Sequence, residues 1–169
     1  MFNKGRYMKF IAEFCQNHNG NFKILEKMIK SASKSGATYG KIQNIYAEDL
    51  TFRPEFETGI KINNKILAIK RPYKKEYKRL KKLEIKKNDI KNFIKICKDN
   101  NLIPLTTCFV QSHVDEIRDL GFKSIKVASY DCGSFPMIEK LKKNFDEIIV
   151  STGASFDDEI EKTYNIFKK

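Results

Sequence analysis

The sequence predicts an α/β fold: an incomplete TIM-type (β/α)8 barrel of about five strand–helix units, with a long insertion after the second strand. Short apolar runs alternate with stretches in which apolar residues recur every three to four positions, the pattern of buried strands followed by amphipathic helices. Polar side chains stand directly after these runs, as they do on the active-site rim of such barrels. No GxGxxG or P-loop motif is present, which disfavours an open, doubly wound sheet. We therefore expect residues 1–169 to form one partial barrel domain.

The first two units are compact. Phe10–Phe14 is a short apolar run that predicts a strand, and a polar Gln-Asn-His-Asn-Gly turn follows it. A helix comes next, and Gly36 is suited to end it. Its apolar positions at helical spacing are Phe22, Leu25, Ile29 and Ala32. Tyr39–Ile42 predicts the second strand.

The long insertion occupies residues 44–84. It contains a polar loop, then a hairpin-like stretch at Ile60–Leu67 that turns at Asn63-Asn64. A basic stretch with partly helical spacing follows at Lys70–Lys87. Insertions of this size after a barrel strand usually cover the catalytic rim, so we expect a lid or a substrate-binding wall here.

Three further units continue the repeat. Their predicted strands are Ile103–Thr107, Ser124–Ala128 and Ile148–Val150. The helix before the first of these strands covers Lys87–Asn100, and Pro136 suits the first turn of a helix that ends near Lys143. Two helix starts carry Ser-x-x-Asp pairs that resemble capping boxes. These pairs are Ser112 with Asp115 and Ser155 with Asp158.

Composition indicates a soluble globular protein, because 41% of the residues are hydrophobic and 32% are charged. No apolar run approaches the roughly 20 residues that a membrane span needs, and no signal-peptide core precedes the first strand. We therefore expect a cytoplasmic protein without a membrane partner. The formal net charge of +12 is spread over helix faces, which disfavours a nucleic-acid partner. A non-catalytic module that binds nucleic acid through Lys70–Lys87 stays open as an alternative.

The four cysteines form no CxxC pair and are expected to be reduced thiols. Cys15, Cys108 and Cys132 lie at or just past predicted strand ends, so a soft-metal thiolate site is one interpretation. Small apolar filler at strand ends is the simpler interpretation, and no residue of this chain is predicted as a metal ligand.

Polar groups end each of the five predicted strands. They are Glu13 with the turn 16–19, Lys41 with Gln43, Thr106 with Thr107, Lys126 with Ser129 and Asp131, and Ser151. Because the carboxyl ends of parallel strands meet on one rim, two lysines, several hydroxyls and two acids should surround a small, multiply anionic ligand. Each residue alone has a simpler explanation: an exposed rim lysine, a hydroxyl that satisfies strand-end backbone, or a helix cap. His18 is expected to form hydrogen bonds within its loop rather than bind a metal.

The chain also carries a series of longer motifs. In order they are IAEFCQNHNG at 11–20, GKIQ at 40–43, AEDL at 47–50, YKRLKKLEI at 77–85, PLTTCF at 104–109, KVASYD at 126–131, FPMIEKL at 135–141 and VSTGAS at 150–155. Together these motifs resemble the N-terminal barrel region of the N-acetylneuraminate (sialic acid) synthase family, over roughly residues 9–160. One such motif would be weak, but this many in the same order identify the chain as similar to that family.

The resemblance implies an enzyme of sialic acid biosynthesis. Such enzymes condense phosphoenolpyruvate with an N-acylated amino sugar such as N-acetylmannosamine, and they release phosphate and a nine-carbon 2-keto sugar acid. A divalent metal, manganese or magnesium, polarises the sugar aldehyde in the complete enzyme, which is expected to be a homodimer. The family combines a (β/α)8 barrel with a small antifreeze-like domain.

The resemblance also implies roles for individual residues. The phosphoenolpyruvate contacts implied by the motifs are Lys41, Thr107, Lys126, Ser129 and Ser151. Gln43 is implied as a sugar contact. Glu13 is implied as a carboxylate near the metal and the sugar, and Asp131 as an acid for proton transfer.

Two departures from the family pattern limit these expectations. The metal-binding histidines of the family lie on late strands, and neither they nor the antifreeze-like domain are expected within this chain. We therefore expect the isolated chain to be poorly active or inactive. A Schiff-base aldolase that uses Lys41 or Lys126 stays open as a second enzymatic interpretation.

Overall fold

The computed structural model describes residues 8–168 and contains one five-stranded, fully parallel sheet. Its strands follow the order β1-β2-β5-β6-β7. They are β1 (Ile11–Cys15), β2 (Tyr39–Ile42), β5 (Ile103–Cys108), β6 (Ser124–Val127) and β7 (Glu147–Val150). All five strands predicted from the sequence are confirmed, with ends that differ by no more than one residue.

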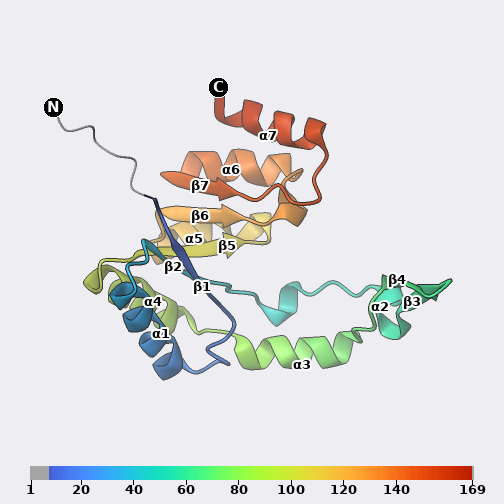
Figure 1. Cartoon of the computed structure of the whole chain (residues 1–169), viewed down its shortest axis with the longest axis horizontal. Helices are drawn as coiled ribbons and strands as arrows, with labels where there is room; N and C mark the ends of the chain where they lie inside the picture. The colour runs from blue at the N-terminus through green and yellow to red at the C-terminus, as the bar shows by residue number, and fades with distance from the viewer. Residues whose placement is uncertain (1–7, 169) are drawn as a thin grey trace.

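Strand order matches chain order throughout the sheet, and this explains the shape of the fold. A crossover between parallel strands is right-handed, so crossovers that always step in one direction place their helices on one face. Those helices are α1 (Phe22–Lys34), α4 (Lys87–Asp99), α5 (Val114–Leu120) and α6 (Phe135–Asn144), and α7 (Asp157–Lys168) follows β7 and packs against α6 (Figure 1). A doubly wound sheet would reverse direction at a switch point, and this sheet does not. The barrel-type prediction is therefore confirmed.

The sheet is strongly curled. In a flat sheet, β2 and β7 would stand about 14 Å apart, because three strand spacings separate them. Instead, the hydroxyl of Tyr39 on β2 donates a hydrogen bond to the carboxylate of Glu147 on β7, at 2.7 Å. Lys9 and Ser124 donate to the same carboxylate at 3.0 and 2.9 Å. The described strands thus form an open arc of five, where a closed TIM barrel has eight.

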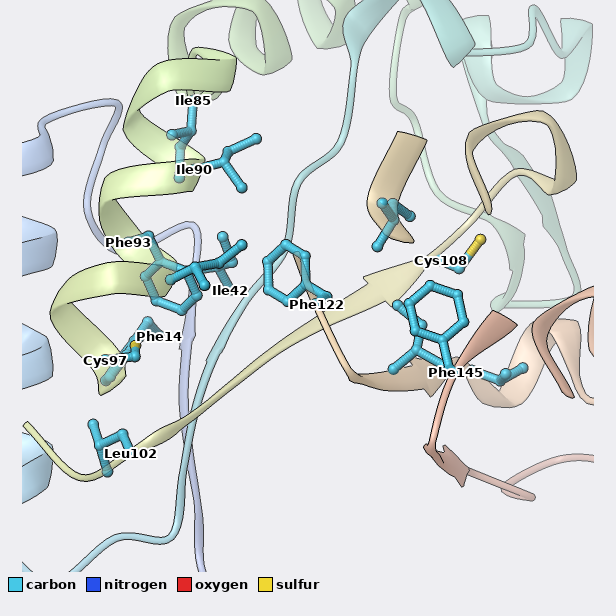
Figure 2. Close-up of a cluster of buried hydrophobic side chains, with 14 of the residues drawn as sticks. Phe14, Ile42, Ile85, Ile90, Phe93, Cys97, Leu102, Cys108, Phe122 and Phe145 are labelled. Carbon is cyan, nitrogen blue, oxygen red and sulfur yellow. The ribbon is translucent and has the colours of Figure 1, made fainter. Parts of the chain in front are cut away.

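The two faces of the sheet differ in chemistry because side chains alternate along a strand. The outer face is apolar and is covered by the helices. Its buried strand residues are Phe14, Ile42, Cys108, Ile125 and Val127. Figure 2 shows this core, in which Phe93 and Ile90 of α4 lie close to Ile42. The concave face carries Glu13, Lys41, Thr107 and Lys126 instead, so it is the polar face.

Helix ends follow the sequence in some places and not in others. The side chain of Asn21 caps α1 by accepting from the backbone N–H groups of residues 23 and 24, at 2.9 and 3.3 Å. Pro136 lies in the first turn of α6, as predicted.

The two predicted capping boxes are wrong. A 3-10 helix, η2 (Gln111–His113), precedes α5, and α5 has no side-chain cap. Asp115 instead pairs with the ammonium group of Lys140 at 2.6 Å, a charge-assisted contact that outweighs a neutral cap. At α7 the helix begins at Asp157, and the backbone N–H of Phe156 donates to Glu159 at 2.9 Å.

The insertion contains more structure than the sequence predicts. The additional elements are the 3-10 helix η1 (Ala47–Asp49) and the short helix α2 (Pro54–Thr58). The predicted hairpin is present as β3 (Ile60–Ile62) and β4 (Lys65–Ala68), which pair antiparallel. Asn63 and Asn64 both adopt positive φ, at 47° and 61°, as a type I′ turn requires. The basic stretch forms α3 (Tyr73–Leu83), and Figure 1 shows the hairpin at the far end of α3 from the sheet.

The near end of α3 is fixed against the loop that follows β1. Arg79 donates to the side-chain oxygen of Gln16 at 3.2 Å. Gly20, with φ of +73°, approaches α3 so closely that a Cβ there would lie 2.2 Å from the carbonyl oxygen of Lys82. Glu84 accepts the backbone N–H of Ala47 at 2.7 Å. The insertion is therefore tied to the body near its chain ends, and its hairpin projects away from the sheet (Figure 1). Within residues 8–168, no helix has both the length and the apolar character to cross a membrane.

Candidate active site

The concave face of the sheet carries an ion pair between its first two strands. Glu13 and Lys41 are register partners on β1 and β2, and their side chains meet at 2.6 Å. Lys41 is only 2% exposed, whereas the side chain of Glu13 is 42% exposed. The second oxygen of Glu13 accepts the backbone N–H of Cys15 at 3.0 Å. Burial of the Lys41 ammonium is thus compensated by a carboxylate that still faces the open concave side.

Lys126 on β6 is the second cation of this face, and it lacks such compensation. Its ammonium donates to the hydroxyl of Ser151 at 2.5 Å and to the carbonyl of Val127 at 3.2 Å, and it pairs with no carboxylate within residues 8–168. Burial lowers the pKa of Lys126, the nearby charge of Lys41 lowers it further, and the charge of Glu13 raises it. Glu13, Lys41 and Lys126 therefore lie within Coulomb range of one another, and Ser151 belongs to the same group.

Three hydroxyl or amide residues predicted for the site lie around these charges. Thr107 is buried on β5 and is the register partner of Lys126. Ser129 begins the 3-10 helix η3 (Ser129–Asp131), and its Cβ would lie 3.9 Å from a Cβ built on Gly153, so the loops after β6 and β7 are neighbours. Gln43 follows β2 directly, and its backbone N–H donates to the backbone carbonyl oxygen of Cys15 at 3.3 Å.

Asp131 ends η3 and is half-buried. Its carboxylate accepts no hydrogen bond from the described residues, and α6 has no side-chain cap, so Asp131 is not a helix cap. Burial raises the pKa of Asp131 above its usual range. A raised pKa favours a role as proton donor, because the carboxyl group keeps its proton at higher pH than usual.

The two histidines lie outside this group of charges. His18 is 1% exposed, and its Nδ1 accepts the backbone N–H of Gly20 at 3.0 Å, as expected for a loop hydrogen-bonder. Its Nε2 is buried and finds no partner among the described residues, and burial lowers its pKa, so the ring is neutral. His113 in η2 contacts Asp49 of the insertion at 3.0 Å.

Three of the four cysteines are apolar filler, as the simpler interpretation predicts, whereas Cys15 is only partly buried. Cys97, Cys108 and Cys132 are buried free thiols. Burial raises the pKa of Cys97 to about 12 and that of Cys108 to about 11, so both stay protonated. Within the described part of the chain, no three His, Cys, Asp or Glu side chains gather in a way that could hold a metal ion.

A cavity of about 340 Å³ opens beside the group of charges, between the insertion and the end of β5. Its wall includes Thr107, the aromatic residues Tyr46 and Tyr73, and the arginines Arg53 and Arg71. The sequence interpretation missed these insertion residues, because no strand register places them. Its only relevant signal was the general expectation that an insertion covers the rim.

Comparisons with known proteins agree on one family and one fold. The model of the NeuB family matches residues 28–169. The N,N'-diacetyllegionaminic acid synthase of Campylobacter jejuni is 31% identical over 167 residues, covering 94% of this chain and 46% of that protein. The mouse N-acetylneuraminate-9-phosphate synthase is 26% identical, covering 94% and 42%. The chain thus spans about half the length of the curated relatives it matches.

Solved structures support the fold. The N-acetylneuraminic acid synthetase of Leptospira borgpetersenii superposes with a TM-score of 0.76 at 22% identity, covering 94% of this chain and 49% of that one. A truncated 3-deoxy-D-arabino-heptulosonate 7-phosphate synthase of Thermotoga maritima reaches 0.64 at 7% identity, covering 97% and 48%. At such identities the likeness concerns the arrangement of strands and helices alone.

Proposed function

The chain belongs to the NeuB family, and from this premise we propose that its concave face binds phosphoenolpyruvate for a sialic-acid-type synthase. The reaction condenses phosphoenolpyruvate with an N-acylated amino sugar, of the N-acetylmannosamine kind, to a nine-carbon 2-keto sugar acid and phosphate. Curated relatives carry the names of legionaminic, sialic and pseudaminic acid synthases, which all make acids of this class.

The observation that carries the proposal is the uncompensated ammonium of Lys126 beside the Lys41–Glu13 pair. Two cations and one carboxylate leave this half-buried group with a net positive charge. A half-buried cation without a counter-ion is costly unless an anion binds there. Phosphoenolpyruvate carries a phosphate and a carboxylate, and it can therefore contact both lysines at once.

The surrounding hydroxyl groups suit the same ligand. Thr107, Ser129 and Ser151 can donate hydrogen bonds to phosphate or carboxylate oxygens, and Ser151 already accepts from Lys126. Gln43, at the end of β2, is assigned to the acceptor sugar. These groups would hold the two reactants together, which removes much of the entropic cost of a bimolecular step.

The chemical step needs one proton donor and one water molecule. The terminal carbon of phosphoenolpyruvate attacks the sugar aldehyde carbon, and the aldehyde oxygen becomes an alkoxide that takes a proton. We assign this proton to Asp131, whose raised pKa keeps the carboxyl group protonated at higher pH than usual. Water then adds to the oxocarbenium carbon of the former enol and returns one proton to the Asp131 carboxylate. The C–O bond to phosphate breaks next, the new hydroxyl becomes the keto group, and its proton leaves with the phosphate. Glu13 pairs with Lys41 at 2.6 Å, and we assign it to the acceptor side of the site.

The family resemblance also implies a divalent manganese or magnesium ion and a homodimer. A bound metal would polarise the sugar aldehyde. Within residues 8–168, Glu13 is the assigned carboxylate near that position, and no further ligands gather around it. The described residues therefore do not fit a metal site by themselves, and the steps above depend on none.

A Schiff-base aldolase is the second candidate, because the lowered pKa of Lys126 is also what an imine-forming lysine needs. Treatment with pyruvate and borohydride distinguishes the two. A covalent mass increase on Lys126 would favour the aldolase, whereas the synthase forms no imine and predicts no increase.

Calorimetric titration of the 169-residue chain with phosphoenolpyruvate tests the proposal. Lys126→Ala should weaken binding by at least about tenfold, since it removes a charge-assisted contact. Lys91→Ala, at an exposed position on α4, is the matched control and should change nothing. Equal affinity of the Lys126→Ala and unchanged chains would overturn the proposal. In an assay with phosphoenolpyruvate, manganese and N-acetylmannosamine, we expect little phosphate release from this chain alone.

A further inference from the structure

The cavity under the insertion has the size and walls of a small-molecule site. Its volume of about 340 Å³ lies within the range of ligand pockets. One wall comes from the insertion, through Leu50, Tyr73 and Leu80. The opposite wall comes from the segment after β5, through Phe109, Val110 and Ile117. Apolar and aromatic walls of this kind favour the faces of a sugar ring or another ring-shaped body.

Two arginines in this wall are free of carboxylate partners. Within residues 8–168, neither Arg53 nor Arg71 forms an ion pair, although both line the cavity and both are exposed. Phe56 links the backbones of the two arginines. The backbone N–H of Arg71 donates to the carbonyl oxygen of Phe56 at 2.7 Å, and the backbone N–H of Phe56 donates to the carbonyl oxygen of Arg53 at 3.0 Å. Two guanidinium groups that line one cavity can together bind a phosphate group, because each offers several N–H donors and a charge.

Acidic residues of the same wall already have partners. Glu76 pairs with Arg79 at 2.7 Å, Glu116 pairs with Lys87 at 2.9 Å, and Asp49 contacts the His113 ring at 3.0 Å. The two arginines are therefore the groups of this wall best placed to attract an anionic ligand.

Arg53 also connects the cavity to the phosphoenolpyruvate site. Its guanidinium lies over the rings of Phe56 and Tyr130, 5.7 and 5.9 Å from their centroids, and donates to the Tyr130 hydroxyl at 3.4 Å. Stacking on rings leaves N–H groups in the plane of a guanidinium available for hydrogen bonds. Tyr130 stands between Ser129 and Asp131, and Thr107 lines the cavity while pairing in register with Lys126. A ligand in the cavity would therefore reach both the arginines and the reacting face.

We propose that this cavity binds an acceptor sugar that carries a phosphate group, with the ring against the aromatic wall and the phosphate on Arg53 and Arg71. The inference rests on the proposed function and makes it more specific, because it assigns an anionic rather than a neutral acceptor. A phosphate monoester carries a charge of about −1.5 to −2 near neutral pH, which matches two guanidinium groups.

Calorimetric titrations of the 169-residue chain with four probes test the inference. The probes are N-acetylmannosamine 6-phosphate, N-acetylmannosamine, inorganic phosphate and phosphoenolpyruvate. The sugar phosphate should bind at least about tenfold more tightly than the neutral sugar. Arg53→Ala with Arg71→Ala should remove that difference and leave phosphoenolpyruvate binding unchanged, whereas Lys126→Ala should do the reverse. Lys91→Ala is the matched control.

Several results would overturn the inference. They are equal binding of the two sugars, an unchanged affinity in the double arginine variant, no saturable binding of the sugar phosphate, and binding of inorganic phosphate as tight as that of the sugar phosphate. The last result would indicate a site for free anions. If the double alanine variant fails to fold, Arg53→Lys with Arg71→Lys replaces it, and the expected result is a smaller loss, because lysine cannot form bidentate contacts.

Failure of this inference is separable from failure of the proposed function. Phosphoenolpyruvate binding that depends on Lys126, without preference for the sugar phosphate, would leave the proposed function standing and refute the acceptor assignment. Loss of the dependence on Lys126 would instead refute the proposed function, whatever the arginine variants show.

Discussion

The five-stranded sheet and the insertion at residues 44–84 are built on different principles. In the sheet, register places each functional side chain: Glu13 opposite Lys41, and Thr107 opposite Lys126. In the insertion, position depends on a few side-chain and backbone contacts to the body, such as those of Gly20 and Glu84. The sheet is also covered by a buried core, whereas the hairpin exposes Ile62, Ile66 and Leu67. The polar concave face of the sheet should therefore be rigid, and the cavity under the insertion should depend on contacts that single substitutions can remove.

The largest contrast is expected between core truncations of the two regions. Phe93→Ala removes a 0% exposed ring from the core between α4 and the sheet, and it should lower the free energy of unfolding by about 3–5 kcal/mol. Ile66→Ala in the hairpin, where Ile66 is 67% exposed, should change it by no more than about 0.5 kcal/mol. Denaturation in urea measures both values. Similar losses in the two variants would contradict the division into a packed body and a projecting insertion.

A second substitution tests the junction between the two regions. Gly20→Ala introduces a Cβ 2.2 Å from the carbonyl oxygen of Lys82 and also places alanine at a φ of +73°. The φ alone should lower the free energy of unfolding by about 1–2 kcal/mol, and the clash should add to this. Gly36→Ala is the matched control, since its φ is +78° and nothing lies within 4 Å of its Cβ. The difference between the two variants measures the clash.

Hydrogen exchange gives the Gly20 substitution a second readout. Amides of α3 should exchange faster in Gly20→Ala than in Gly36→Ala, because α3 must move away from the loop after β1. Identical α3 exchange in both variants would show that the insertion does not depend on this contact.

The charges of the sheet make a prediction about pH. Because the pKa of Lys126 is lowered, phosphoenolpyruvate binding should weaken as pH rises through that lowered value, before free lysine would lose its proton. Lys41→Met should raise the pKa of Lys126 by removing a like charge, and Glu13→Gln should lower it by removing an opposite charge. Nuclear magnetic resonance titration of the lysine side-chain carbons measures these shifts. If the pKa of Lys126 shifted in the same direction in both variants, Lys41 and Glu13 would not both lie close enough to act on its charge.

The same lowered pKa affects stability. Folding disfavours the charged form of Lys126. Its contribution to the free energy of unfolding is therefore least favourable at pH values where the lysine is charged in both the folded and the unfolded chain. This contribution becomes more favourable as pH rises above the folded-state pKa toward the unfolded-state value near 10.5. Lys126→Met should flatten this pH dependence of the free energy of unfolding.

The smallest effect is expected at the tip of the hairpin. Asn64→Gly creates the Asn-Gly pair that a type I′ turn favours, and the φ of residue 64 is already +61°. The hairpin amides should exchange more slowly, while the free energy of global unfolding should change by no more than about 0.5 kcal/mol. A large global stabilisation would mean that the hairpin unfolds together with the sheet.

Much of the fold was accessible from the sequence because its signals are local. The alternation of buried runs and helical periods predicted all five strands of the sheet, and the Asn63-Asn64 pair predicted the hairpin turn. Prediction failed at the starts of α5 and α7, where Asp115 and Asp158 pair with Lys140 and Lys162 and do not complete the expected caps. A capping motif is a weak preference, and a nearby ammonium group is enough to redirect a carboxylate.

The residues of the candidate site also divide into those that the sequence predicts and those that only the tertiary structure brings together. Polar residues at strand ends were identifiable because a parallel sheet brings its carboxyl ends to one edge, so Glu13, Lys41, Lys126 and Ser151 could be grouped from the sequence. Arg53, Arg71 and Tyr130 could not be grouped, because they come together only when the insertion folds back over the end of β5.

By itself, the amino-acid sequence determined the strand–helix repeat, the one-directional strand order it favours and the polar ends of the strands, since all of these depend on neighbours along the chain. The tertiary structure alone decided that Lys126 has no carboxylate partner among residues 8–168 while Lys41 has one, and that two arginines of the insertion stand beside an aromatic cavity. The physical reason is that charge compensation and cavity shape depend on distances between segments far apart in the chain. Sequence periodicity contains no information about those distances.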